Sequence, residues 1–276
     1  MLAFALNLRD SHATLGRVAR PCGVRSVVGP CRGDCRLDPS EFDSAVSEVA
    51  ELSDLWRLMV DFAAAYQVER IGYHHLPPPG SPDAALLRVE NHGFGEALLA
   101  QYLAARVQGI AALADAVHRI GRPVYLAELP GLVRLTPQEL AHLEGYRAGG
   151  IENGLSLEAF GPNGRNGIFA FDLGATVRLA PSALGRLRWG CQVMHLRYCE
   201  LLLPTLGEVP SLSAREAEVL GWVARGKSNA AIAEILGISA HTVDAHLRRI
   251  YLKLGVFDRI SAALRALGFG LIKLEG

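Results

Sequence analysis

The chain has 276 residues, 50% of them hydrophobic, which is enough for one or two domains with a buried core. Its 28 basic and 28 acidic residues cancel, so the total charge points to neither a nucleic-acid nor a membrane partner. Lysine occurs only at positions 227, 253 and 273. This excludes a P-loop and a Schiff-base enzyme site from the first 210 residues, because both need a lysine amine.

Hydrophobic periodicity divides the chain into segments. Residues 1–38 show no sustained period, and we expect a poorly ordered extension there. The elements expected next, in chain order, are a helix that opens at Ser40 and carries apolar residues as far as Met59, strands over 68–76 and 86–91, helices over 96–106 and 110–120, a short strand over 123–126, a helix capped by Thr136 and Glu139, strands over 155–160 and 167–173, and a long helix over 181–203.

The order of these elements predicts the fold class. Gly161–Asn166 separates two short apolar runs, and its Gly, Pro and Asn residues predict a hairpin loop. We therefore expect an α+β protein, with an N-terminal α/β/α sandwich over residues 39–203 that contains a mostly antiparallel sheet. Residues 204–210 hold two prolines and a glycine and are the expected linker to an all-α domain over residues 211–276.

Three features bear on the cellular compartment. No run of about 18 apolar residues lacks charges, so no membrane span is expected. Met1–Leu8 is apolar, but no basic region precedes it, as a signal peptide would require. Five cysteines are an odd number for a secreted disulfide scaffold, so we expect a cytoplasmic protein.

The C-terminal segment from residue 211 carries nine basic and six acidic residues behind a more acidic body. This distribution is typical of a nucleic-acid module joined to a sensor or an enzyme. Ser213 and Glu216 match a capping box at the start of a helix, and Gly226 suits its end. A second helix follows, and Ser239 caps a third one after a short turn that contains glycine. Two helices joined in this way predict a helix-turn-helix.

The third helix of this segment has an apolar stripe and an opposite polar face. The polar face predicts a reading surface for the DNA major groove, where Arg pairs with guanine and Asp accepts from cytosine. Neighbouring lysines and a helix N-terminus suit phosphate contacts. The competing interpretation is an ordinary solvated face. The expected DNA-binding residues are Lys227, Ser228, Asn229, His241, Thr242, Asp244, Ala245, Arg248, Arg249 and Lys253.

This segment closely resembles the LuxR-type DNA-binding domain. The resemblance rests on Leu212–Leu220, Gly226–Asn229, Leu236–Ser239, His241–Val243 and Lys253–Val256. It implies a homodimer that binds double-stranded DNA at a palindromic operator, with half-sites about one helical turn apart. The last helix mediates dimer contacts in that family.

The preceding domain resembles the autoinducer-binding domain of quorum-sensing LuxR regulators over about residues 41–203. Tyr73–His75 is similar to its early aromatic strand, and Gly150–Gly154 is similar to the entry of its hairpin. Pro123 and Glu128 resemble the part of the family pattern that surrounds its Pro-Phe-x-Trp motif. The resemblance implies a ligand cavity. Its expected lining residues are Tyr73, Phe94, Leu98, Tyr102, Ala111, Tyr125 and Leu126.

Two departures from the family pattern bear on the ligand. Leu98 stands where the family has a Trp that donates to the lactone head group, and Ala111 stands where it has an Asp that accepts from the ligand amide. A buried amide without a partner costs about 1–3 kcal/mol. We therefore expect an orphan member with a degenerate lactone site, which senses another small molecule or none. Its tyrosines are either polar anchors or core residues with satisfied hydroxyls.

Cys191, His195 and Cys199 recur at a spacing of four residues, which places them on one face of a helix. Since no fourth ligand is evident, the pattern favours packing, and we expect neither a metal nor a cofactor. A second cluster combines His12 with cysteines at positions 22, 31 and 35, in the segment expected to be poorly ordered.

These features predict a sequence-specific DNA-binding transcriptional regulator of the LuxR type. Its N-terminal domain is expected to sense a small molecule other than a typical acyl-homoserine lactone. The alternative is a ligand-independent regulator whose N-terminal domain serves dimerisation or protein interaction. An enzyme is not expected, because no catalytic set can be argued from the spacing of residues.

Overall fold

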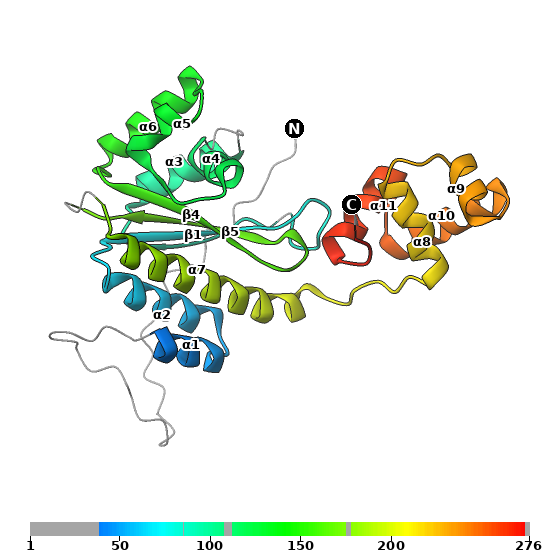
Figure 1. Ribbon diagram of the computed structural model, residues 1–276, viewed down its shortest axis with the longest axis horizontal. Coiled ribbons are helices and arrows are strands. Elements are labelled where there is room, and N and C mark those ends of the chain that lie inside the picture. Colours follow the sequence, from blue (N-terminus) through cyan, green and yellow to red (C-terminus); the bar gives the residue numbers. More distant parts are fainter. Residues whose placement is uncertain (1–38, 85, 108–111, 175–177, 274–276) are drawn as a thin grey trace. The chain divides into compact units, whose positions relative to one another are not determined.

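The computed structural model describes residues 39–84, 86–107, 112–174 and 178–273 (Figure 1). The extension expected over residues 1–38 lies outside this range. Among the described helices, none combines the length and the apolar character needed to cross a membrane. The elements of the α/β domain are α1 (Pro39–Glu48), α2 (Leu52–Ala64), β1 (Arg70–Leu76), β2 (Arg88–His92), α3 (Glu96–Val107), α4 (Ala112–Ile120), β3 (Val124–Tyr125), η1 (Leu126–Glu128), α5 (Leu129–Leu132), α6 (Pro137–Ala148), β4 (Gly154–Phe160), η2 (Pro162–Gly164), β5 (Asn166–Asp172), α7 (Pro181–Leu202) and η3 (Leu203–Leu206).

Five strands form one antiparallel sheet in the order β2-β1-β5-β4-β3. Strand β1 pairs on both sides, so that Tyr73 lies opposite Glu90 of β2 and Phe169 of β5. Strands β4 and β5 are joined by the expected hairpin loop. Within it Asn163 has φ 55° and Gly164 has φ 75°, a left-handed conformation that Asn and Gly adopt most readily. The hairpin prediction is confirmed.

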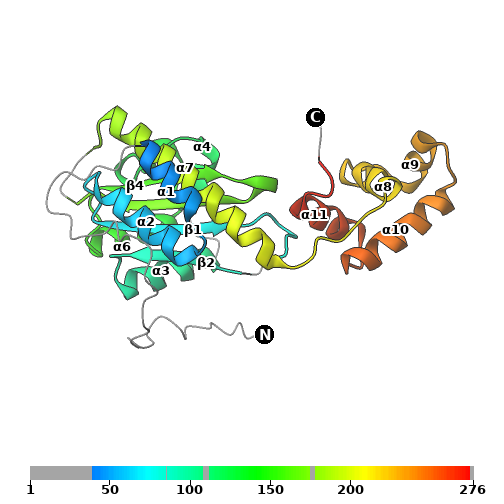
Figure 2. The same cartoon turned by 90° about the horizontal axis from the view of Figure 1, so that it is seen from below.

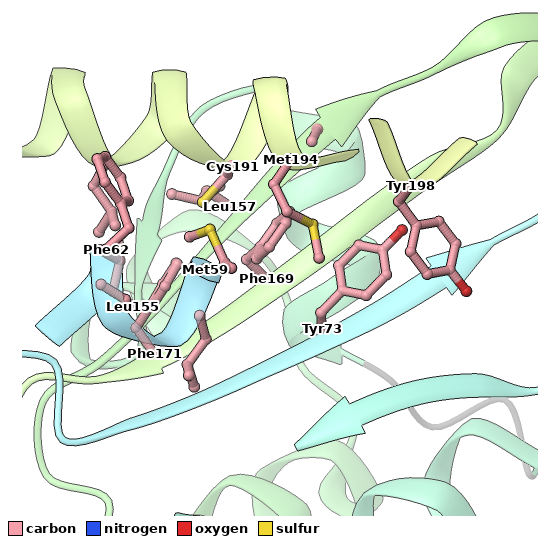
Figure 3. Close-up of a cluster of buried hydrophobic side chains, with 14 of the residues drawn as sticks. Met59, Phe62, Tyr73, Leu155, Leu157, Phe169, Phe171, Cys191, Met194 and Tyr198 are labelled. Carbon is pink, nitrogen blue, oxygen red and sulfur yellow. The ribbon is translucent and has the colours of Figure 1, made fainter. Parts of the chain in front are cut away.

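Helices cover both faces of the sheet, which confirms the expected sandwich (Figures 1 and 2). Helices α1, α2 and α7 lie on one face, and α3, α4 and α6 lie on the other (Figure 2). Successive side chains of a strand point to opposite faces. The α7 face therefore receives Tyr73, Leu157, Phe169 and Phe171 (Figure 3), and the α3 face receives Ile168.

The expected first helix is divided into two. Helix α1 ends at Glu48 and α2 begins at Leu52. The break frees the carbonyl oxygen of Val49, which accepts hydrogen bonds from Nε and Nη2 of Arg197 on α7, at 3.1 and 2.7 Å. The interruption therefore depends on a residue far away in the sequence, and the local hydrophobic period shows no sign of it.

The C-terminal helical domain contains four helices with their own core. They are α8 (Ala214–Ala224), α9 (Asn229–Leu236), α10 (Ala240–Leu254) and α11 (Arg259–Phe269). The capping box of Ser213 and Glu216 is confirmed, with both reciprocal hydrogen bonds present. Ser239 accepts from the backbone of Thr242 and so caps α10 as expected. Gly226 has φ 78° after the end of α8.

Helix α7 approaches α2 closely at a glycine. The ring of Phe62 stacks on Phe42 with ring centroids 4.0 Å apart, and both rings are buried. A Cβ atom added at Gly190 would lie 2.2 Å from Cε1 of Phe62. Gly185 lies on the same helix, but a Cβ atom there would meet no described atom within 4 Å.

This contact predicts opposite effects for two identical substitutions. Gly190→Ala should lower the free energy of unfolding by about 1–3 kcal/mol, because the core must shift to admit the methyl group. Gly185→Ala should raise it by about 0.5–1 kcal/mol through helix propensity alone. Urea unfolding followed by far-UV circular dichroism measures both. Equal changes in the two variants would contradict the close packing of α7 on Phe62.

Candidate ligand cavity and nucleic-acid interface

A cavity of about 100 Å³ lies in the α/β domain between the sheet and helices α3 and α6. One water molecule needs roughly 10–15 Å³ by this measure, so the space suffices for part of a small organic molecule. Most of the wall is apolar. The residues that line it include Phe94, Leu98, Tyr102, Leu126, His142, Tyr146, Ser156, Ile168 and Ala170, together with His74 of β1.

Two histidine–tyrosine pairs supply most of the polar character of this wall. His74 Nδ1 lies 2.6 Å from the hydroxyl oxygen of Tyr102, and His142 Nε2 lies 2.8 Å from that of Tyr146. Burial, the positive charge of Arg106 and the neighbouring His75 lower the pKa of His74 to about 3. Burial also lowers the pKa of His142. Both imidazoles are therefore neutral at pH 7. Burial also raises the pKa of the Tyr146 hydroxyl, which is therefore protonated.

Of the other polar residues of the wall, Ser156 is engaged and Glu90 is turned away, whereas Asn91 keeps a buried Oδ1 that has no partner among the described residues. Ser156 donates its hydroxyl hydrogen to the carbonyl oxygen of Phe169 at 3.0 Å. Glu90 lies opposite Tyr73 in the β1–β2 ladder, so its side chain shares the α7 face of the sheet with Tyr73. Burial raises the pKa of Glu90, although Arg88 acts in the opposite direction. The cavity thus offers a ligand mainly hydroxyl and imidazole groups.

The structure places the expected lining residues in three groups. Phe94, Leu98, Tyr102 and Leu126 line the cavity as the sequence predicts. Tyr73 contributes to the wall, but its hydroxyl lies 2.8 Å from His195 Nδ1 on the opposite face. Tyr125 is not part of the cavity wall.

Tyr125 belongs to the core on the α7 face. It precedes Leu126 directly, and adjacent residues of a strand point to opposite faces. Its hydroxyl oxygen accepts from the backbone N–H of Leu179 at 3.3 Å, and the guanidinium of Arg178 lies 4.6 Å from its ring centroid. Ala111 lies outside the described residues.

The wall also contains residues outside the predicted set, among them His74, His142 and Tyr146. In the sequence His74 is recognisable only as part of an aromatic strand, and His142 and Tyr146 lie on α6. These last two are four residues apart on a helix, so that spacing could have suggested a pair on one face. Their proximity to the cavity depends on how α6 packs, which the local pattern does not show.

In the helical domain, α10 separates an apolar stripe from an accessible polar face. Val243, Leu247, Ile250 and Leu254 are buried. His241, Arg248 and Arg249 are exposed, and Ala245 is half-buried. Arg248 Nη2 lies 2.5 Å from Asp244 Oδ2 one turn earlier, and both side chains remain substantially exposed at 72% and 41%. The predicted polar face of α10 is therefore accessible in the free chain.

The residues expected to contact phosphates have different environments. Lys227 is exposed, just before Ser228 caps α9 by accepting from the N–H of Ala231. Asn229 Oδ1 is buried and has no hydrogen-bond partner among the described residues. Thr242 shares a hydrogen bond of 2.8 Å with the cap residue Ser239, so its hydroxyl serves the start of α10.

Lys253 has a structural partner that the sequence did not suggest. Its ammonium nitrogen lies 2.7 Å from Oε2 of Glu216, the acid of the capping box at the start of α8. The Glu216 side chain is only 5% exposed. Burial acts to raise the pKa of Glu216, but Lys253 and Ser213 together hold it below its ordinary value. Lys253 thus joins the end of α10 to the start of α8.

Comparison with known proteins gives two family matches. Residues 51–198, more than half of the chain, match the family described as "Autoinducer binding domain". Residues 210–266 match "Bacterial regulatory proteins, luxR family". The transcriptional activator protein AhyR of Aeromonas hydrophila is 29% identical over 156 residues, which cover 54% of this chain and 60% of AhyR.

Two solved structures share the fold. One is SdiA of Escherichia coli, with a TM-score of 0.57 and 20% identity over 84% of this chain and 97% of that one. The other is SdiA in complex with octanoyl-rac-glycerol, with a TM-score of 0.57 and 19% identity over 84% of this chain and 94% of that one. By contrast, the chain spans only about a quarter to three fifths of the curated relatives that it matches in sequence.

The Lys253–Glu216 pair predicts a pH-dependent loss of stability. Lys253→Met should lower the free energy of unfolding of the helical domain by about 1 kcal/mol at pH 7, since one end of the pair is partly screened by water. In the wild type, the lowered pKa of Glu216 stabilises the folded state at pH values above its ordinary pKa of 4.5. This stabilisation is lost as the pH falls through the pKa of Glu216 in the folded state. The difference between variant and wild type should therefore shrink below pH 4.5.

Lys273→Met is the matched control, because it removes the same charge from an exposed lysine of the same domain. Urea unfolding of the full chain at pH 7 and at pH 3 measures both variants. An equal loss in the two variants, or a loss for Lys253→Met that is the same at both pH values, would contradict the role assigned to this pair.

Proposed function

We propose that this chain is a ligand-responsive transcriptional regulator that binds DNA sequence-specifically. The chain belongs to the LuxR-type regulators, which join an autoinducer-binding domain to a LuxR-type helix-turn-helix. The family match also makes it a regulator rather than an enzyme. The observation that carries the proposal for DNA is the accessible polar face of α10 opposite its buried stripe.

Arg248 is the residue we assign to reading a base. Its ion pair with Asp244 is exposed, and such pairs contribute only about 0.2–1 kcal/mol. A bidentate contact between Arg and guanine in the major groove is worth about 1–3 kcal/mol of discrimination. DNA can therefore replace Asp244 as the partner of Arg248 at little cost. Lys227 and the N-terminus of α9 are assigned to phosphate contacts.

We further propose that the chain acts as a homodimer on a palindromic operator. Phe257, in the connection between α10 and α11, and Ile260, in the first turn of α11, are apolar and 98% and 69% exposed. Exposed apolar side chains of this size mark interaction surfaces when they cluster. Pairing of two such surfaces would place two copies of α10 at half-sites about one helical turn apart.

The proposed ligand is an uncharged molecule with an apolar tail and a head group rich in hydrogen-bond acceptors. Tyr102 and Tyr146 supply hydroxyl groups, and their histidine partners are neutral. Leu98 on the wall can neither donate nor accept a hydrogen bond. An acyl-homoserine lactone would bury an amide N–H, and Ala111 stands where the family has the Asp that accepts from it. Without another acceptor, the buried N–H costs about 1–3 kcal/mol, or roughly 5- to 150-fold in affinity.

An acylglycerol is the probe that this chemistry favours. SdiA, which shares the fold, has been solved in complex with octanoyl-rac-glycerol. The ester linkage of an acylglycerol has no N–H group, and its two glycerol hydroxyl groups can both donate and accept hydrogen bonds, as the hydroxyl and imidazole groups of the wall can. We therefore choose octanoylglycerol as the test compound and an acyl-homoserine lactone of the same acyl length as its comparison.

The DNA proposal predicts a change in specificity for one arginine. Arg248→Ala should reduce the affinity for the best operator, selected from random sequence, by about 1–3 kcal/mol and relax the preference at one base pair of each half-site. Arg186→Ala removes the same charge from an exposed position on α7 and should leave both unchanged. Binding measured over a range of salt concentrations tests this. If Arg248→Ala kept the preference at every base pair, α10 would not read DNA through Arg248.

The ligand proposal predicts a selective thermal shift. Octanoylglycerol at a hundred times its dissociation constant should stabilise the full chain by about 2.7 kcal/mol, and the lactone should do so far less at the same concentration. Tyr102→Phe should weaken the response to octanoylglycerol, because it removes a hydroxyl that contacts the head group. Tyr125→Phe is the control, since that hydroxyl lies on the other face of the sheet.

Either of two results would count against this ligand. An equal or larger shift with the lactone would mean that other groups replace the missing acceptor. No shift with either compound would favour the alternative, a ligand-independent regulator whose α/β domain serves dimerisation or protein interaction.

A further inference from the structure

Two histidines and a cysteine meet in the core on the α7 face of the sheet. They are His75 of β1 and His195 and Cys199 of α7, and all three are at most 1% exposed. One potential ligand atom from each side chain lies within 4.8 Å of the other two. The packing helix thus contributes two neighbours one turn apart, and the strand contributes the third.

The cluster differs from the one that the sequence suggested. Cys191 lies two turns before Cys199 on α7, but it packs among Leu157 and Met194 in the hydrophobic core (Figure 3). His75 takes its place, since β1 sends this side chain to the same face as Tyr73. A residue distant in sequence therefore supplies the third ligand that the helix alone lacks.

His75 presents an unshared electron pair to the interior. Its Nε2 lies 2.9 Å from Oδ2 of Asp83, and Arg165 holds the same carboxylate through Nε and Nη2 at 3.2 and 3.1 Å. Burial acts to raise the pKa of Asp83, but these hydrogen bonds hold it well below its ordinary value. Asp83 is thus a carboxylate that accepts from Nε2–H. In the neutral tautomer that donates from Nε2, Nδ1 of His75 carries the free electron pair, and this nitrogen is buried with no partner among the described residues.

His195 and Cys199 have the separation that a shared metal ion requires. His195 Nε2 lies 3.7 Å from Cys199 Sγ. A tetrahedral zinc ion with Zn–N and Zn–S bonds of about 2.0 and 2.3 Å sets its nitrogen and sulfur roughly 3.6 Å apart. The other ring nitrogen of His195, Nδ1, lies 2.8 Å from the Tyr73 hydroxyl, which can accept a hydrogen bond from it. Burial lowers the pKa of His195 to about 4, so its ring is neutral.

We propose that His75, His195 and Cys199 form a binding site for a transition-metal ion, with Zn²⁺ as the fitting divalent ion. Imidazole and thiolate are its preferred ligands. Asp83 and Tyr73 act as partners that orient the two histidines, the arrangement that metal-binding histidines commonly have. The carbonyl oxygen of Arg165 lies 3.0 Å from His195 Nε2.

Binding of the ion exchanges one proton. In the metal-free chain Cys199 is a thiol, and burial raises its pKa to about 12. When the metal–sulfur bond forms, the S–H bond of Cys199 breaks and its proton leaves to solvent, while the ring proton of His195 moves from Nε2, where it bonds the Arg165 carbonyl, to Nδ1, where the Tyr73 hydroxyl accepts it. Metal affinity should therefore increase with pH. The bound ion would join α7 to β1 next to His74, whose side chain lines the ligand cavity.

Cobalt(II) provides the direct test, because a thiolate ligand gives it an intense charge-transfer absorption in the near ultraviolet. The full chain is prepared with Cys22, Cys31 and Cys35 replaced by serine, so that only Cys191 and Cys199 carry thiols. It is refolded with Co²⁺ because the site is buried. We expect one Co²⁺ per chain, the thiolate band, and displacement of that band by Zn²⁺.

Two cysteine variants are compared in this background. Cys191→Ala should keep the band, and Cys199→Ala should lose it. His75→Gln keeps both thiols and should lower Co²⁺ affinity at least tenfold, so it decides the matter if Cys199→Ala does not fold. A folded parent without the thiolate band, a band that survives in Cys199→Ala, or unchanged affinity in His75→Gln would overturn the site.

Discussion

The alternation of side chains along β1 is the constraint on which both candidate sites of the α/β domain depend. Tyr73 and His75 point toward α7, while His74 between them points toward α3 and the cavity. Pairing with β2 on one side and β5 on the other fixes this register. A slip by one residue would bury His74 in the dry core and place Tyr73 in the cavity, so the ladder specifies both faces at once.

The two faces differ in how they satisfy polar groups. On the α7 face, buried polar groups are tied into a continuous set, in which Asp83 joins Arg165 to His75 and Tyr73 joins His195. On the cavity face, the polar groups form separate histidine–tyrosine pairs around open space. A hydrogen-bonded network fixes side chains in the core, whereas pairs beside a cavity can exchange partners with a ligand. This difference supports the proposal that the small molecule binds on the α3 face.

Features set by neighbouring residues could be predicted from the sequence. The caps at Thr136 and Ser213, the hairpin around Asn163 and the apolar stripe of α10 follow from short-range patterns, and all are present. Features set by distant residues could not. The break between α1 and α2 depends on Arg197, and the partner of Lys253 lies at the start of α8. The prediction that Tyr125 lines the cavity differs from the structure for a related reason, because the sequence of a two-residue strand does not show which face each side chain takes.

Amide hydrogen exchange tests most directly whether a neutral acyl ligand binds between the sheet and α3, because a bound ligand slows exchange of the backbone amides around it. The full chain is compared with and without octanoylglycerol, and with a lactone of the same acyl length. The account predicts slower exchange in β1, α3 and α6 with octanoylglycerol, no change in α1 and α2, and little change anywhere with the lactone. Protection that appears only in α1 and α2, or that is the same for both compounds, would contradict it.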